Sequence, residues 1–208
     1  MTESPRNPWL AIPLADYEAH MALPEVGQAA LLADLLAEAI ARHAPRSVAV
    51  LGCAGGNGFD RVPADVRLVG VDVNAQYVAT AHGRHRARDG LELYVGDVAA
   101  DDLPFAPVDL AFAGLLFEHV DVDAALGRIA AKLAPGGVLV AVLQLPAQVA
   151  EITPSPYQSL AALAPTMRLV EPATLVSAAQ ALGYSVLHAG IETASGGKQF
   201  AVQTYRRT

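Results

Sequence analysis

A glycine-rich loop is the first candidate for chemistry in this sequence. The stretch "VAVLGCAGGNGFD", from Val48 to Asp60, runs four apolar residues into a segment where four of seven positions are glycine. Strand residues need packing partners, whereas glycine is favoured where the backbone takes unusual dihedral angles or where something approaches it closely. The stretch therefore predicts a buried strand followed by a loop that contacts a ligand.

The glycine spacing disfavours two phosphate-binding loops. A dinucleotide fingerprint needs glycines at i, i+2 and i+5, and no register of these glycines supplies them. A P-loop needs Lys and Ser or Thr after its last glycine, but Phe59 and Asp60 follow Gly58. Gly52, Ala54 and Gly56 instead form a turn of small residues, which favours close approach of an uncharged ligand.

Two acidic residues follow at the ends of later predicted strands. Asp72 comes twenty residues after Gly52, in "GVDVN", and Asp97 ends the next strand, in "YVGDV". An acid at the first place accepts hydrogen bonds from ribose hydroxyls, and one at the second faces the same crevice, where it could meet an adenine edge. The alternatives are a tight turn without a ligand, a surface acid at Asp72 and a loop start at Asp97.

Polar residues in two other segments are candidates for acting on a substrate. The stretch "DYEAHM" supplies Tyr17 and His20, which would gate or contact substrate if their segment folds over the ligand, and would otherwise only cap the sheet. The stretch "LLFEHVD" supplies Glu118 and His119. An imidazole titrates near neutrality, so His119 is a candidate general base. Alternatively, His119 bonds to backbone at a helix entry and Glu118 is a first-turn acid favoured by the helix dipole.

Hydrophobic periodicity predicts the elements that position these residues. Strands are expected at 47–52, 67–73, 91–97, 108–115 and 137–145, and helices at 25–43, 74–87, 171–183 and from 121 to the glycines at 136 and 137. This alternation predicts an α/β fold with a parallel sheet covered on both faces. Residues 184–193 and 199–207 predict an antiparallel pair joined by a glycine turn. Residues 1–24, punctuated by prolines, are expected to be an arm rather than a core element.

Composition limits the class of protein. The chain has 208 residues, a formal net charge of −7, a pI near 5.3 and a single cysteine, Cys53. The length suits one domain, residues 25–208, with the arm 1–24 over the active site. The acidic balance disfavours nucleic acid, and no apolar run or signal peptide indicates a membrane span or export. We expect a cytoplasmic monomer or homodimer without a metal, since His82 and His85 lack a third ligand nearby.

Together these motifs resemble the class I S-adenosylmethionine-dependent methyltransferases. The resemblance covers roughly residues 47–145 and is carried by "VLGCAGG", "GVDVN", "VGDV" and "LAPGGVLV". It implies a Rossmann-like, doubly wound sheet of about seven strands whose last strand is antiparallel, and methyl transfer from S-adenosylmethionine to a small-molecule acceptor. The stretches "IPLADYEAHMALPEVGQ" and "VLGCAGGNG" are also similar to a subgroup of small bacterial methyltransferases.

The resemblance also implies roles for site residues. The glycine loop would line the methionine and nucleoside, Asp72 would hold the ribose and Asp97 with Val98 would meet the adenine. The full cofactor set is Gly52, Cys53, Ala54, Gly56, Asp72, Val73, Asn74, Asp97 and Val98, and the catalytic set is His119, Tyr17, His20 and Glu118. Two positions depart from the family pattern, because Val50 replaces the usual acid and Ala54 replaces the second glycine.

Two other functions stay open at this point. Val50 favours a non-catalytic sensor or partner subunit that binds S-adenosylmethionine or S-adenosylhomocysteine. A nicotinamide-dependent oxidoreductase is supported only by fold analogy and is disfavoured by the glycine spacing. For an enzyme, the insert at 145–169 should form a modest, partly apolar acceptor pocket, with Tyr157 and Met167 as lining residues.

Overall fold

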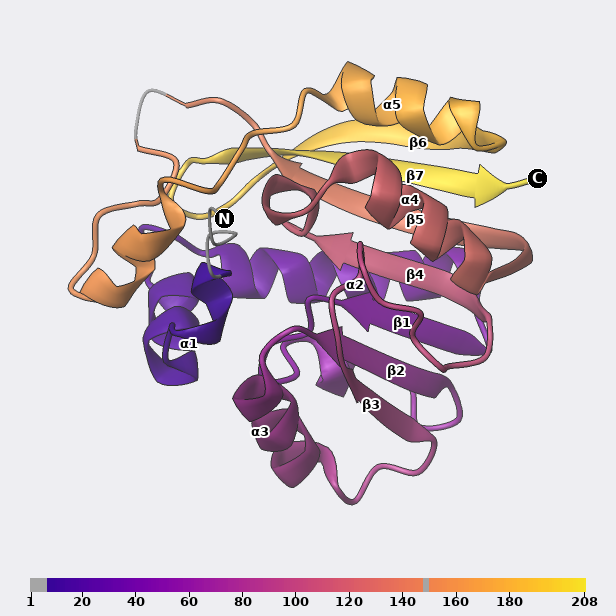
Figure 1. The fold of residues 1–208 in the computed structure, drawn as a ribbon, viewed down its shortest axis with the longest axis horizontal. Helices are drawn as coiled ribbons and strands as arrows, with labels where there is room; N and C mark the ends of the chain where they lie inside the picture. Colours follow the sequence, from indigo (N-terminus) through magenta and orange to yellow (C-terminus); the bar gives the residue numbers. More distant parts are fainter. Residues whose placement is uncertain (1–6, 148–149) are drawn as a thin grey trace, which may run out of the picture.

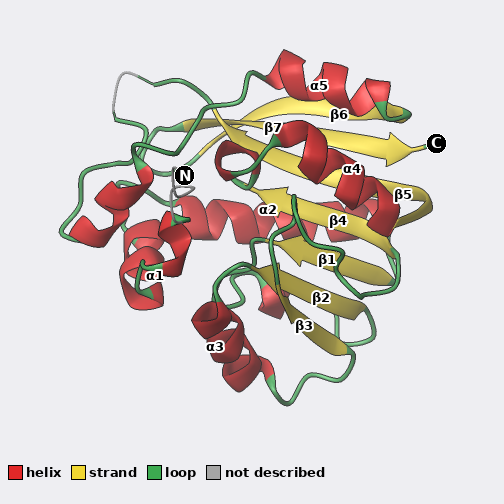
Figure 2. Ribbon diagram, in the orientation of Figure 1, coloured by secondary structure: helices red, strands yellow, loops and turns green. Residues whose placement is uncertain are grey.

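A computed structural model of the chain describes residues 7–147 and 150–208, which form a seven-stranded sheet between two layers of helices (Figures 1 and 2). The strands are β1 (Ser47–Leu51), β2 (Arg67–Asp72), β3 (Leu91–Val95), β4 (Val108–Gly114), β5 (Leu133–Gln144), β6 (Tyr184–Thr193) and β7 (Gln199–Arg207). Their order is β3-β2-β1-β4-β5-β7-β6, and β7 alone is antiparallel to the rest. The predicted Rossmann-like α/β fold with an antiparallel C-terminal strand is confirmed.

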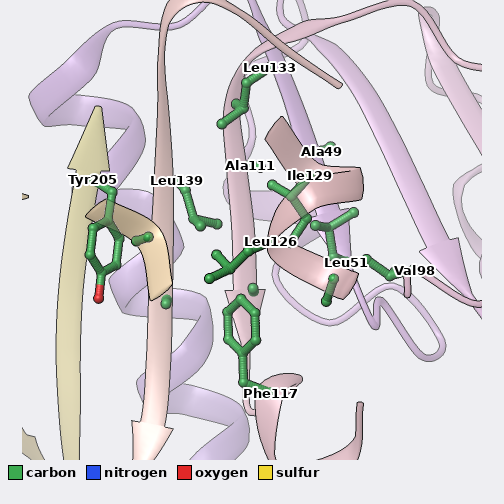
Figure 3. Close-up of a cluster of buried hydrophobic side chains, with 14 of the residues drawn as sticks. Ala49, Leu51, Val98, Ala111, Phe117, Leu126, Ile129, Leu133, Leu139 and Tyr205 are labelled. Atoms are coloured by element: carbon green, nitrogen blue, oxygen red, sulfur yellow. The ribbon is translucent and has the colours of Figure 1, made fainter. Parts of the chain in front are cut away.

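Each face of the sheet carries its own core because successive strand residues point to opposite faces. On one face, Val48 and Val50 pack with residues of α2 (Gln28–His43) and with Ala81 of α3 (Ala75–His85). On the other, Ala49 and Leu51 share a core with residues of α4 (Val122–Lys132) and α5 (Pro172–Ala181). Figure 3 shows part of this second core, with Leu126 and Ile129 of α4 above the sheet. The central strands are therefore apolar on both faces.

The boundary between α4 and β5 differs from the prediction. We expected the helix to continue to the glycines at 136 and 137, but it ends at Lys132 and β5 begins at Leu133. Pro135 gives the reason, because a proline lacks a backbone N–H and disfavours helical dihedrals at the residue before it. Leu133 pairs with Val108 instead, next to an irregularity in the β4–β5 register.

The described part of the arm is more closely packed than predicted. It contains α1 (Leu14–Ala22), and with the short helix Gln158–Leu163 it lies at the end of the molecule where the parallel strands finish (Figure 1). Met21 belongs to the same core as α2, and Ile12 packs with Leu160 and Leu163. The expectation that residues 1–24 contain no core element is therefore wrong for α1. Residues 1–6 lie outside the described residues.

Candidate active site

A cavity lies at the carboxyl ends of β1 to β5, where a doubly wound sheet places its ligands. The arm, the segment around residues 150–167 and the turn before β7 complete its walls. Of the thirteen predicted site residues, nine line it: Tyr17, His20, Gly52, Ala54, Asp72, Val73, Asp97, Val98 and His119. Four do not: Cys53, Gly56, Asn74 and Glu118. The structure therefore brings the arm and the loops that follow several strands together in one site.

The glycines of the loop serve two different purposes. Gly52 has a φ of +74°, and a Cβ added there would meet only Leu116 Cδ1, at 3.6 Å, so the backbone is bare toward the cavity. Gly56 faces α3 instead, because its added Cβ would lie 2.8 Å from His85 Nε2. The placement predicted for Gly56 is thus corrected: its missing side chain makes room for the protein and not for a ligand.

Cys53 also turns away from the cavity. Its side chain is 1% exposed and lies in the core that contains Val50 and Phe59. The thiol lies 3.7 Å from the carbonyl oxygen of Ala54, and burial raises its pKa. The side chain of Cys53 is therefore a packing residue of the loop and does not line the cavity, so a cofactor contact at Cys53 is left to its backbone.

Asp72 presents a buried carboxylate to the cavity from the end of β2. It is 8% exposed, and it accepts hydrogen bonds from the backbone N–H of Ala54, at 2.8 Å, and of Asn74, at 2.9 Å. A carboxylate offers about four lone-pair sites, so these two bonds leave acceptor capacity for a ligand. Burial raises its pKa, while the two backbone bonds oppose that rise.

Asn74 joins the arm to the sheet and does not line the cavity. Its Oδ1 accepts from the N–H of Gln76 at the start of α3, and its Nδ2 donates to the carbonyl oxygen of Trp9 at 2.8 Å. The Trp9 ring packs edge-on against Tyr17 and His119, at centroid distances of 5.4 and 5.0 Å. Asn74 thus acts on the site through Trp9, and its predicted contact with adenosine is corrected.

The two aromatic candidates, Tyr17 and His119, are both uncharged at neutral pH. Burial raises the pKa of the Tyr17 hydroxyl, and the nearby Asp72 carboxylate raises it further. Burial lowers the pKa of His119 to about 4. The expectation that the His119 imidazole titrates near neutrality is therefore wrong for this cavity, where it offers a hydrogen-bonding group.

Glu118 lies beneath the cavity and not in its wall. The side chain is 1% exposed, its Oε1 accepts from the backbone N–H of Gln144 at 2.6 Å, and its Oε2 has no partner among the described residues. Burial raises its pKa to about 7. Its predicted direct catalytic role is corrected, because Glu118 supports the end of β5 and has no exposed atom to offer a substrate.

We predict that Glu118 makes stability fall as pH rises. Its pKa is about 7 when folded and about 4.5 when unfolded, so the folded state binds the extra proton between these values. Relative to Glu118→Gln, the wild type should lose about 3 kcal/mol of unfolding free energy from pH 4.5 to above 7. Denaturant unfolding of both proteins across this range measures the difference. The pKa of His119 is shifted in the opposite direction, and its effect on stability is the same in both proteins and cancels in the comparison. A difference independent of pH would contradict the prediction.

The polar residues of the wall that the sequence analysis missed include Gln28, Gln144 and Lys198. The chain has only two lysines, Lys132 and Lys198, but Lys198 follows two glycines in a predicted tight turn, a position typical of solvent-exposed residues. Only the pairing of β7 with β5 brings that turn to the cavity. Of the two residues predicted in the insert, Met167 lines the cavity, while Tyr157 packs with Ile12.

The sequence matches a known family over the part of the chain that builds this cavity floor. Residues 50–141 match the family model described as a methyltransferase domain. Solved structures of the same fold are methyltransferases that carry S-adenosylmethionine or S-adenosylhomocysteine. The match over residues 50–141 and the shared fold support a class I S-adenosylmethionine-dependent methyltransferase. No curated protein matches the sequence of this methyltransferase.

Several solved structures share the fold of this methyltransferase at low sequence identity. Magnesium protoporphyrin IX methyltransferase from Synechocystis PCC 6803 is 12% identical, with a TM-score of 0.75 and 98% of each chain covered. Geranyl diphosphate C-methyltransferase from Streptomyces coelicolor A3(2) is 15% identical, with a TM-score of 0.65 over 84% of this chain and 79% of that one. The [4+2]-cyclase SpnF is 17% identical, with a TM-score of 0.64 over 94% and 97%. These likenesses show the fold, and the two methyltransferases among them are named for different substrates.

The cavity of the methyltransferase fits its cofactor, S-adenosylmethionine. The bare backbone at Gly52 leaves room for a ligand that no neighbouring side chain fills, and Asp72 has acceptor capacity to spare. Val50 packs in the core at 6% exposure, so no carboxylate stands at the position of the usual acid. The family match nevertheless does not favour the non-catalytic alternative. In residues 7–147 and 150–208, no helix is long and apolar enough to cross a membrane.

Proposed function

We propose that this methyltransferase transfers the methyl group of S-adenosylmethionine to a small-molecule acceptor bound in the same cavity. The observation that carries the proposal is the reach of the cavity along the sheet edge, from Asp97 after β3 to Lys198 before β7. Five strand spacings separate these ends, which is about 24 Å. A cavity of this length reaches across the positions proposed for two ligands that lie end to end.

The two ends of the cavity suit different ligands. We assign the nucleoside and methionine of the cofactor to the loops after β1, β2 and β3, where Gly52, Asp72 and Asp97 lie. The acceptor then occupies the part over β4 and β5, between Leu116 and Gln144. A small acceptor agrees with the enclosure of this part by the arm and by Leu160, and with the net charge of −7, which opposes binding of a phosphate backbone.

Methyl transfer from a sulfonium is an in-line displacement in which the bound donor supplies the activated methyl group. The protein has to align the acceptor atom with that group and exclude water. Asp72 would fix the donor through its ribose, and the arm would close the site, held by the bond from Asn74 to Trp9. His119 and Tyr17 are proposed to orient the acceptor by contact or hydrogen bonding, since both are neutral at pH 7.

This role predicts that His119→Asn lowers turnover while the donor still binds. We expect the methyl-transfer rate to fall about ten-fold, because one orienting contact is lost, with the affinity for S-adenosylhomocysteine unchanged within about two-fold. Single-turnover rates and calorimetric titration measure the two quantities. His43→Asn, at the far end of α2, is the control and should change neither. Equal rates for both variants would remove His119 from the proposed role.

The proposal as a whole is tested by following the methyl group. The wild type and Asp72→Asn are incubated with methyl-labelled S-adenosylmethionine and a cell extract separated into small molecules, protein and nucleic acid. We expect wild-type-dependent label in the small-molecule fraction. Label confined to protein or nucleic acid, or no labelled product from a protein that binds S-adenosylhomocysteine tightly, would contradict it.

A further inference from the structure

The end of the cavity farthest from Asp72 is rich in hydrogen-bond donors. We use the name distal polar cluster for His20, Gln28, Gln144 and Lys198, which all line the cavity and are 3–6% exposed. Glu151, an exposed residue, also lines the cavity at this end, and Asp72 and Asp97 lie at the opposite end. The buried charged side chains, Lys198 at this end and Asp72 at the other, therefore differ in sign.

Lys198 is the charged member of the distal polar cluster. Its Nζ donates to the carbonyl oxygen of Glu151 at 2.6 Å, the only hydrogen bond of this ammonium among residues 7–147 and 150–208. Over the same residues, no carboxylate oxygen lies within 4.0 Å of Nζ. An ammonium carries three donors, so two remain for a ligand or water. Burial lowers its pKa, an effect that the Glu151 charge partly offsets.

The neighbouring side chains increase the surplus of donors. The Nε2 of Gln144 donates to the same Glu151 carbonyl, at 2.9 Å, so two donors share one acceptor. The side chain of Gln28 makes no hydrogen bond with the described residues. Its amide is thus available to the cavity. His20 Nδ1 lies 2.9 Å from Ser155 Oγ, and burial followed by the charge of Lys198 lowers its pKa, so its imidazole is neutral at pH 7.

The fold holds Lys198 in this place rigidly. The turn that precedes β7 rests on the loop between α1 and α2, where Ser195 Oγ donates to the carbonyl oxygen of Pro24 at 2.9 Å. The contact is close, since a Cβ added at Gly196 would lie 1.8 Å from the carbonyl oxygen of Glu25. A lysine on a turn that packs against the rest of the protein is preorganised for a ligand. On a turn without such contacts, the side chain would extend into solvent.

From this arrangement we infer that the acceptor is an organic monoanion, with a carboxylate bound by Lys198, Gln28 and Gln144. Such a group accepts several hydrogen bonds and neutralises a buried ammonium, and charge-assisted bonds of this kind are about twice as strong as neutral ones. The rest of the acceptor is apolar, because Leu160, Leu163 and other apolar side chains form the nearby wall. The inference deepens the proposed function and rests on it, since it places the acceptor beyond the cofactor.

The test compares three acids with their neutral amides: benzoate, 3-phenylpropanoate and octanoate against the corresponding amides. Binding is measured by calorimetry on protein saturated with S-adenosylhomocysteine. We expect at least one acid to bind the wild type about ten-fold or more tightly than its amide. The preference should vanish in Lys198→Met and persist in Lys132→Met, the control at the other lysine, which pairs with Asp102. Thermal unfolding checks the fold, and Lys198→Gln serves if the methionine variant is unstable.

The outcomes separate this inference from the proposed function. Absence of any acid preference, or a preference that survives in Lys198→Met, overturns the inference and leaves cofactor binding intact. If Lys198→Met weakens S-adenosylhomocysteine itself ten-fold, Lys198 holds the carboxylate of the cofactor and the inference is also overturned. Failure of the wild type to bind S-adenosylhomocysteine would instead overturn the proposed function.

Discussion

Asp72→Asn is expected to weaken S-adenosylhomocysteine binding by roughly 10- to 100-fold. The carboxylate is 8% exposed in the cavity wall, and ribose hydroxyls that donate to it would form charge-assisted bonds in a poorly solvated place. Hydrogen bonds to a charged group contribute about 1.5–3 kcal/mol, and each 1.4 kcal/mol is a factor of ten in affinity. An amide retains the size of the side chain but loses the charge and one acceptor. Calorimetric titration measures the change directly.

The matched control for this variant is Asp109→Asn. Asp109 also accepts backbone N–H groups, those of Arg46 at 2.8 Å and Ser47 at 3.1 Å, but it lies near the start of β4, at the other end of the parallel strands from the cavity. Asp72→Asn should lose about 1–3 kcal/mol of stability, because Ala54 and Asn74 donate to different carboxylate oxygens and one of them loses its acceptor. Both backbone donors to Asp109 bind Oδ2, which the amide oxygen of an asparagine can replace, so Asp109→Asn should lose less stability. Only Asp72→Asn should lose affinity. Equal affinities for the two variants would exclude Asp72 from the cofactor site.

Gly52→Val should reduce the affinity for S-adenosylhomocysteine by about 100-fold or more. A side chain here projects into the cavity, where a Cβ meets only Leu116 and the remaining space is needed by the cofactor. In addition, the φ of +74° is unfavourable for a β-branched residue. Backbone strain of this kind costs about 1–3 kcal/mol and lowers stability as well as affinity.

The variant Gly136→Val is a control that separates the effect of backbone strain from the effect of filling the cavity. Gly136 has the same φ of +74°, but a Cβ added there would meet nothing within 4 Å, and the residue does not line the cavity. Denaturant unfolding should therefore give similar stability losses for the two variants, while binding is lost only in Gly52→Val. If Gly52→Val still binds S-adenosylhomocysteine like the wild type, the bare backbone at Gly52 has no role in binding.

The sheet and its ligand-binding edge were predictable because their signals are local. Apolar runs bounded by glycine or proline marked the strands, and alternation with helices fixed a parallel sheet whose carboxyl ends share one edge. The pair Gly52 and Asp72 followed from the same reasoning, since their spacing is set by one strand, one connection and the next strand. Both residues line the cavity.

The parts that were wrong depend on packing between distant segments. Gly56 and Gly52 look alike in sequence, and only the position of His85 on α3 decides that Gly56 faces the protein. His119 and Glu118 are adjacent, yet one lines the cavity and the other is enclosed under β5. Burial disfavours the charged form of each group, so it lowers the pKa of the His119 imidazole and raises the pKa of the Glu118 carboxyl. No local pattern carries this information.

The distal polar cluster could not be predicted for a related reason. Its members come from α1, α2, β5 and the turn before β7, and only His20 was among the candidate site residues. The decisive step is the antiparallel pairing of β7 with β5, which places Lys198 beside the end of β5. A sequence analysis that follows motifs finds the cofactor end of such a site more readily than the acceptor end.

A crystal structure of the wild type with S-adenosylhomocysteine tests the central claim most directly. The account predicts ribose hydroxyls at about 2.6–3.2 Å from the Asp72 carboxylate, the methionyl part against the Gly52 backbone and the sulfur directed toward the space over β4 and β5. A ribose without contact to Asp72, or a ligand bound outside this cavity, would contradict it.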